Sequence, residues 1–342
     1  MARKICEENE RIKRQYFQYL REAKGCDQTT VDKAADAIQR FEGTTRCKPF
    51  KRFHIEQATH FKRQLEKARH QRTGKPLSKA TLDGTLRAVK AFVHWLAGQQ
   101  GYKSRISYGD ADYFNLNAKD ARIAHAERDT PFPTMAQCRR AFDLMPSVTE
   151  IDRRNRALFA FLMLTGARDG AIASLRLKRI NLDESCVYQD ARDVKTKNAK
   201  TFTTWFFPVD AAYLDCFTEW MNHLRQNLVF GNEDALFPKP AMGLADGSFV
   251  VQGLTREPYA NAGKIREVVK AAFTDAGLPA FGPHSFRKTL GILANDHCLT
   301  PERFKAWSLN LGHENIATTL SAYCPVSSER QGALIRAMAA VA

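Results

Sequence analysis

The residues best suited to chemistry lie near the end of the 342-residue chain, in the stretch LGHENIATTLSAYCP at 311–325. His313 follows a Leu-Gly pair, and Tyr323 lies ten residues further along. A short helix over 316–320 would place these two side chains near each other. A tyrosine hydroxyl has a pKa of about 10, so it becomes a nucleophile only beside a base or in a strong field. Because a buried Tyr is usually only a packing residue, this pair needs chemical partners elsewhere.

A first partner is Arg168, in the stretch FLMLTGARDGAIASLRLKRINLD at 161–183. The apolar run predicts a helix that ends at Thr165 and Gly166, and a second short helix is expected directly behind the arginine. Such a turn holds a guanidinium rigidly and close to the core. Taken alone, Arg168 is more typical of a residue that pairs with a nearby acid.

A second set of partners is basic. Residues 185–210 predict a β-hairpin with strands over 186–193 and 201–209, and its turn carries Lys195, Lys197 and Lys200. A lysine at a hairpin tip can project an ammonium group into a groove. A charged tip that serves only solubility is an equally good interpretation of these three residues.

A third partner set is the pair His284 and Arg287 in FGPHSFRKTLGILA at 281–294. Pro283 and Ser285 suit the start of a helix, so His284 and Arg287, three residues apart, lie on one side of its first turn. A helix N-terminus, an imidazole and a guanidinium that converge on one point form an anion site.

Together these residues are suited to phosphoryl transfer onto a tyrosine. Two arginines can bridge the non-bridging oxygens of a phosphodiester, which elsewhere is the role of Mg²⁺. A histidine can act as the base, and a lysine or histidine can protonate the departing sugar oxygen. The sequence shows no carboxylate cluster and no Cys/His spacing suited to a metal.

The order TGxR, hairpin Lys, HxxR, LGH and Tyr resembles that of the tyrosine recombinase, or phage integrase, family. The resemblance implies that Arg168 and Arg287 hold the scissile phosphate. It implies that His284 and His313 hydrogen-bond this phosphate and manage protons. Tyr323 would attack to form a 3′-phosphotyrosyl link, and a hairpin lysine would be the general acid for the 5′ oxygen.

The sequence departs from the family pattern at two points. The family carries an acid three residues after the first arginine, whereas this chain has Ala171 there, so Asp169 is a candidate replacement. The family tyrosine lies nine residues after the LGH histidine rather than ten, which suggests a one-residue bulge in the helix that carries Tyr323. Among the hairpin lysines we expect Lys197 to be catalytic, ahead of Lys200 and then Lys195.

The resemblance also implies partners and a setting. The expected partners are double-stranded DNA recombination sites of a mobile genetic element and accessory DNA-bending proteins. The expected assembly is a homotetramer on two duplexes. No metal, ATP or other cofactor is expected, and the location would be the bacterial cytoplasm, with nucleoid association when DNA is bound. A type IB topoisomerase-like relaxing enzyme and a catalytically silent DNA-binding regulator are the alternatives. The DNA sequence and the choice among integration, excision, resolution and transposition stay open.

Charge and composition agree with a nucleic-acid partner. The chain has a formal net charge of +15 with 44% apolar residues, and residues 1–130 carry 27 Lys and Arg against 16 Asp and Glu. Such a field attracts polyanions. Ten basic residues against two acids between Arg46 and Lys75 suit contacts with phosphates. The eight cysteines are scattered and are expected to be free thiols, and no run is long enough to cross a membrane.

The elements that must position these residues follow from periodicity. Helices are predicted over 8–24, 30–41, 54–69 and 78–100. Ser78 is expected to cap the last of these helices, whose apolar face is formed by Leu82, Leu86, Val89, Val93 and Leu96. Thr134 is expected to cap another helix. The predicted fold is mainly α with a small β-sheet: a helical, SAM-like DNA-binding domain over 1–105, a linker over 106–130 and an α+β catalytic domain over 131–326. An apolar stripe of Leu334, Met338 and Val341 predicts a terminal helix within 327–342, packed on its own subunit or on a neighbour.

Overall fold

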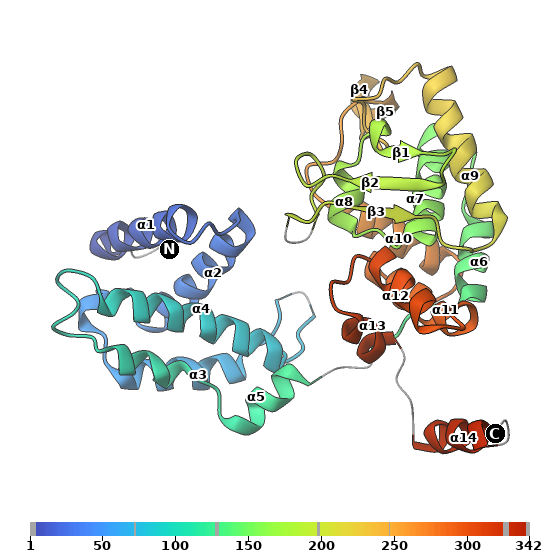
Figure 1. Ribbon diagram of the computed structural model, residues 1–342. Helices are drawn as coiled ribbons and strands as arrows, with labels where there is room; N and C mark the ends of the chain where they lie inside the picture. Colours follow the sequence, from blue (N-terminus) through green and yellow to red (C-terminus); the bar gives the residue numbers. More distant parts are fainter. Residues whose placement is uncertain are drawn as a thin grey trace. The chain divides into compact units, whose positions relative to one another are not determined.

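The computed structural model describes residues 5–71, 73–126, 130–196, 199–245, 247–323 and 328–339. The chain divides into two compact units, residues 1–129 and residues 130–342 (Figure 1). Each unit has its own hydrophobic core, so each is described separately.

Unit 1 is entirely helical over its described residues, as the sequence predicts. Its elements are α1 (Glu7–Glu22), α2 (Gln28–Thr44), η1 (Phe50–Arg52), α3 (Ile55–Lys67), α4 (Lys79–Ala97), η2 (Tyr108–Phe114) and α5 (Ala118–His125). Ser78 caps α4 by accepting a hydrogen bond from the backbone N–H of Thr81, and Asp27 caps α2 in the same way.

The core of unit 1 is rich in aromatic rings. Phe41 makes edge-on contacts with Phe61 and Phe114, with ring centroids 5.3 and 5.4 Å apart. The predicted stripe of α4 is fully buried against these rings. Packing of an amphipathic face, rather than helix propensity, therefore holds the unit together.

The predicted linker over 106–130 is wrong for most of its length. Residues 108–114 form η2 and residues 118–125 form α5, and both pack on α4. Ile106, Ala111 and Phe114 are buried in the core of unit 1. Single apolar anchors in a tight 3₁₀ turn give no 3.6-residue stripe, so the pattern does not indicate a packed element.

Unit 2 combines helices with two small sheets. Its helical elements are α6 (Met135–Leu144), α7 (Glu150–Thr165), α8 (Asp169–Ser174), η3 (Leu177–Arg179), α9 (Ala211–Asn222), the π-helix η5 (His223–Asn227), α10 (Gly263–Asp275), α11 (Pro283–His297), α12 (Pro301–Asn310), α13 (Ile316–Tyr323) and α14 (Ser328–Ala339). The predicted terminal helix corresponds to α14. Thr134 caps α6 within a full capping box, as expected.

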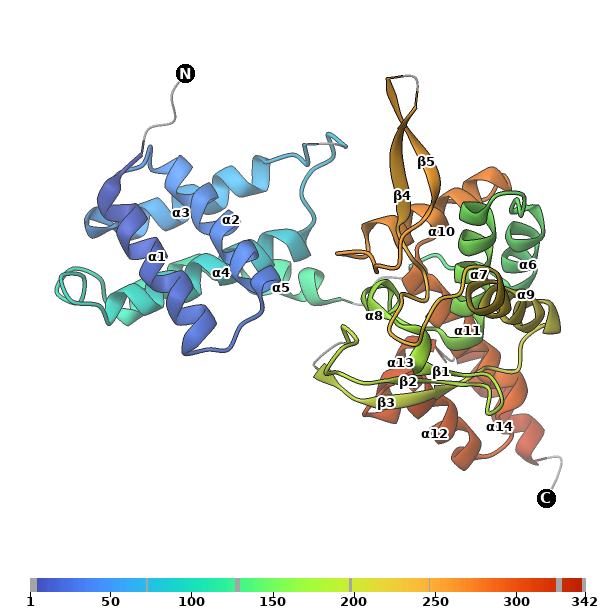
Figure 2. The ribbon, with the colours of Figure 1, turned by 90° about the horizontal axis from the view of Figure 1, so that it is seen from above.

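Helix α7 is the centre of unit 2. All its residues from Ala157 to Thr165 are buried, and α6, α9, α10 and α11 pack around it (Figures 1 and 2). Buried Arg154 donates a hydrogen bond from Nη1 to the carbonyl oxygen of Pro238 at 2.8 Å. A helix enclosed on all sides places its C-terminal end, and whatever follows it, deep in the unit.

The first sheet has the order β1 (Ile180–Asn181), β2 (Cys186–Gln189), β3 (Phe202–Trp205), all antiparallel. The hairpin was predicted, but its strands are shorter than expected. Strand β2 ends at Gln189 because the carboxylate of Asp190 accepts the backbone N–H of Arg192 at 3.0 Å and turns the chain. A second sheet, β4 (Pro240–Ala245) with β5 (Ser248–Leu254), was not predicted.

We predict that Phe114→Ala lowers the free energy of unfolding by about 3–5 kcal/mol, because it empties a site filled by a ring that is 1% exposed. Its neighbour Tyr113 is 44% exposed, so Tyr113→Ala is the matched control and should change stability little. Denaturant unfolding measures both variants. Equal stability of Phe114→Ala and wild type would show that η2 is not part of the unit 1 core.

Candidate active site

The turn that carries Arg168 is fixed by a glycine. Gly166 ends α7 in the left-handed conformation, with φ of 56°. A Cβ at this position would lie 3.1 Å from Cδ1 of Leu290 and 3.2 Å from Cδ2 of Leu311. Both the backbone conformation and the tight packing therefore require glycine. Arg168 follows as the residue before α8 and is half-buried.

Arg287 joins three separate segments of the chain. It lies on α11 and is only 3% exposed. Its Nη1 donates to the carbonyl oxygen of Gly166 at 2.7 Å, and its Nη2 donates to the carbonyl oxygen of Leu311. Nη2 also lies 3.1 Å from Nε2 of His313. One guanidinium thus connects the end of α7, helix α11 and the loop between α12 and α13.

The contacts of His313 define its protonation. Arginine only donates, so Nε2 of His313 accepts from Arg287 and the ring proton lies on Nδ1. Nδ1 donates to Oγ1 of Thr319 at 2.7 Å, and this oxygen lies 2.6 Å from Oγ of Ser308. Burial, together with the positive charge of Arg287 and more weakly of other nearby groups, lowers the pKa of His313 to about 4. The ring is therefore neutral at physiological pH.

The loop that carries His313 is attached to strand β3. The side-chain Oδ1 of Asn310 accepts the backbone N–H of Trp205 at 2.7 Å, and its Nδ2 donates to the carbonyl oxygen of the same residue at 2.8 Å. Gly312 has φ of 71°, and a Cβ there would lie 2.9 Å from Cζ of Phe202. The glycine of the Leu-Gly-His sequence is thus explained by a close approach between this loop and the lysine hairpin.

The three hairpin lysines have different surroundings. The ammonium of Lys195 donates to the carbonyl oxygen of Ala260 at 2.9 Å. Lys197 lies outside the described residues. Nζ of Lys200 lies 3.9 Å from Oε1 of Glu314 and 5.8 Å from the ring centre of Phe202. Lys200 is also among the cations that lower the pKa of His313, so it lies beside the loop of that histidine.

The remaining predicted residues lie on α11, on α13 and in α8. His284 is exposed on the first turn of α11, and its charge also lowers the pKa of His313. Tyr323 is the last residue of α13, and its side chain lies outside what the structure describes. Asp169, the candidate support for Arg168, accepts a hydrogen bond from Nε of Arg266 at 2.5 Å, while Ala171 is buried.

Sequence reasoning missed the residues that hold His313 in place. Thr319 is completely buried on α13, and Ser308 is buried at 1% exposure on α12. Thr319 precedes Tyr323 by four residues, one helical turn, which is the signal that could have indicated a link between the histidine and the end of α13. Among the described residues, no group of three or more His, Cys, Asp or Glu is arranged to hold a metal ion.

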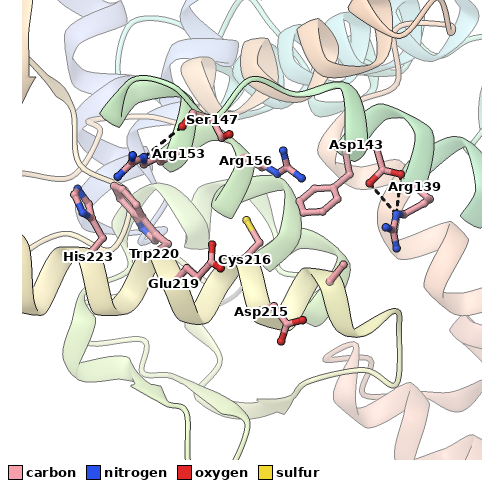
Figure 3. Close-up of a pocket in the computed structure, with 12 residues that line it drawn as sticks. Arg139, Asp143, Ser147, Arg153, Arg156, Asp215, Cys216, Glu219, Trp220 and His223 are labelled. Carbon is pink, nitrogen blue, oxygen red and sulfur yellow. Dashed lines mark hydrogen bonds and ion pairs between the residues drawn. The ribbon is translucent and has the colours of Figure 1, made fainter.

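A cavity of about 500 Å³ between α6, α7 and α9 contains none of these residues (Figure 3). Its arginines are occupied by the protein: Arg153 donates to the carbonyl oxygen of Ser147, and Arg139 pairs with Asp143. Arg156 lies over the ring of Phe142 at 4.5 Å. Burial raises the pKa of the Cys216 thiol in this cavity to about 11, which keeps it protonated and unreactive.

Comparisons with known proteins agree with the fold. Residues 134–330 match the family described as the phage integrase family. The integrase of transposon Tn1549, solved in complex with transposon right end DNA, is 16% identical, covers 96% of this chain and 99% of that chain, and has a TM-score of 0.60. A lambda integrase dimer bound to a COC′ core site is 12% identical, with coverages of 92% and 94% and a TM-score of 0.62. The search of curated proteins finds no match.

The fold shared with these two structures extends over nearly the whole length of each chain, so both units of this chain have counterparts in them. None of the described helices has the length and apolar character needed to span a bilayer.

We predict that the His313 ring titrates with a midpoint near pH 4 rather than near the ordinary value of 6.5. The folded state binds this proton less readily than the unfolded state, so the stability contributed by neutral His313 is complete above about pH 6.5. It is lost progressively as the pH falls from 6.5 toward 4. Nitrogen-15 NMR of the labelled histidines measures the midpoint. A midpoint at or above 6.5 would contradict the buried geometry.

We predict that Thr319→Val destabilises the protein by about 1–3 kcal/mol, because Nδ1–H of His313 and the hydroxyl of Ser308 lose a buried partner. Thr319→Ser keeps the hydroxyl and is the matched control, which should retain most of the stability. Denaturant unfolding compares the two variants. If Val and Ser have the same effect, the hydroxyl does not hold the histidine.

Proposed function

Because the chain belongs to the phage integrase family, we propose that it is a site-specific DNA recombinase that cuts and rejoins DNA through a 3′-phosphotyrosyl intermediate on Tyr323. The observation that carries this proposal is the junction at Arg287. Its contacts bring together the Gly166 turn, the LGH loop and α11, which are far apart in the sequence. The charges that lower the pKa of His313 come from Arg287 and His284 on α11, from Arg168 after the Gly166 turn, and from Lys200 in the lysine hairpin.

The proposed chemistry follows from the charges. Arg168 and Arg287 bind the non-bridging oxygens of the scissile phosphate and stabilise the charge that develops as Tyr323 attacks. The neutral His313 ring can accept a proton, and His284 is placed to hydrogen-bond the phosphate from the first turn of α11. An incoming phosphate partly cancels the cationic field on His313, so its pKa should rise when DNA binds.

A hairpin lysine protonates the 5′ oxygen as it departs. We keep Lys197 as the first candidate, on the position it holds in the predicted hairpin. Lys200 is the alternative, and it is supported by its place beside the His313 loop. Lys195 is the least suitable, because its ammonium is bonded to the carbonyl of Ala260.

The partner we propose is double-stranded DNA at recombination sites. The charge excess of 52 Lys and Arg over 37 Asp and Glu supports binding to phosphates, and unit 1 carries much of it. The Tn1549 and lambda integrases of similar fold were solved bound to DNA. We further propose that four copies act on two duplexes and that α14 binds a neighbouring copy. Accessory DNA-bending proteins would assist this assembly.

We predict that the protein forms an SDS-resistant covalent adduct on a nicked duplex that contains the segment it protects in a DNase I footprint. The adduct should be absent in Tyr323→Phe and unaffected by EDTA, because the two arginines supply the positive charge. Tyr188→Phe, at a tyrosine 41% exposed on β2, is the matched control and should keep the adduct. Loss in EDTA with recovery in Mg²⁺ would contradict the role given to Arg168 and Arg287.

A further inference from the structure

The β4–β5 hairpin has one strongly apolar face. Its register pairs Met242 with Val251 and Leu244 with Phe249. Because cross-strand partners share a face and alternate residues point the same way, these four side chains lie together on one side of the hairpin. They are 54%, 50%, 66% and 77% exposed, respectively. We call this set of four residues the hairpin face.

The opposite side of the hairpin is different in character. Gly243 pairs with Val250 there, and the side chain of Gln252 lies over the glycine so closely that a Cβ would collide with it. Ser248 is exposed near the turn. Val250, 38% exposed, lies on this side beside Gly243, Gln252 and Ser248, so the hairpin face carries most of the exposed apolar surface of the hairpin.

The root of the hairpin is firmly mounted on unit 2. Leu254 packs against the main core. The backbone N–H of Thr255 donates to the carbonyl oxygen of Lys239 at 2.9 Å, and the N–H of Lys239 donates to that of Glu257 at 3.1 Å. Beyond this root the hairpin projects away from the other elements of the unit (Figure 2). An apolar surface on a fixed projecting support is typical of an interaction site.

The charge of the hairpin argues for a protein partner rather than DNA. The sequence from Pro240 to Thr255 contains no Lys or Arg, although the chain carries 52 of them. The flanking cations are engaged with neighbouring acids: Lys239 with Glu257, and Arg256 with Asp234. A surface that binds phosphates needs available cations.

We propose that the hairpin face packs against the same face of a second copy of this chain when both copies are bound to neighbouring DNA sites. An uncharged apolar face is complementary to itself, as a two-fold contact requires, even though each copy carries a net charge of +15. A surface of like positive charges on this basic chain would repel its own copy in the same arrangement. The inference rests on the proposed DNA-binding function and adds to it the surface by which bound copies recognise each other.

The size of the face explains why DNA is needed. Four side chains per copy are far fewer than the roughly 20–30 residues a side that form a stable interface. The contact alone is therefore weak, and free copies stay apart. Binding to adjacent DNA sites raises the effective concentration of one copy near the other to about the millimolar range. The hairpin face then acts as a source of cooperativity.

The test compares binding to an end-labelled duplex that carries one copy of the footprinted segment with binding to one that carries two adjacent copies in inverted orientation, which relates the bound proteins by a two-fold axis. Leu244→Glu should reduce cooperativity on the two-site duplex by roughly tenfold or more and leave single-site affinity unchanged. Ser248→Glu places the same charge on the other side of the same hairpin and should bind like wild type. A mixture of Leu244→Glu with Leu244→Lys copies should restore cooperativity, because opposite charges then meet in the contact.

Each other outcome overturns the proposal. Unchanged cooperativity in Leu244→Glu would show that the face contacts no second copy. An equal loss of single-site affinity would show that the face serves DNA binding or its own fold. Failure of the mixture to recover would show that the partner surface is not the same face. If the wild-type protein bound neither duplex, the proposed DNA-binding function itself would be contradicted.

Discussion

The site depends on the burial of one guanidinium. A charged group that is almost fully enclosed must have hydrogen-bond acceptors around it, because burying it unpaired costs several kcal/mol. Arg287 meets this requirement with the carbonyl oxygens of Gly166 and Leu311 and with Nε2 of His313. The end of α7 and the loop after α12 are therefore tied to α11. Movement of either segment would break a hydrogen bond to this guanidinium.

The same constraint extends outward to the hairpin and to α13. Nε2 of His313 accepts a hydrogen bond from Arg287, so Nδ1 must donate. Oγ1 of Thr319, on the helix that ends at Tyr323, accepts that hydrogen bond. On the other side, the Asn310 side-chain amide hydrogen-bonds the backbone N–H and the carbonyl oxygen of Trp205. Because Gly312 has no side chain, the ring of Phe202 can pack closely against the backbone of the loop. The lysine hairpin and the helix with the proposed nucleophile are thus connected through one short loop.

Sequence patterns predicted the parts of this arrangement that are local. The stripe and the Ser78 cap define α4, and the end of α7 at Gly166 follows from a helix-breaking residue after an apolar run. Contacts that depend on tertiary packing were not predictable. Phe114 anchors η2 without periodicity, and the bond between Thr319 and His313 exists only because α12 and α13 pack together. The β4–β5 hairpin was missed because β4 consists largely of Pro, Ala and Gly, which are weak strand formers, so β5 had no recognisable partner strand.

The central claim is that the separated motifs converge on a single phosphate. A crystal structure of Tyr323→Phe bound to a duplex with the footprinted segment tests this geometry directly, because the variant keeps the site but cannot cleave. We expect one phosphate within hydrogen-bonding distance of Arg168, Arg287 and His284, with the substituted ring at position 323 facing it. A duplex whose phosphates contact other residues of unit 2, with no phosphate at Arg287, would contradict it.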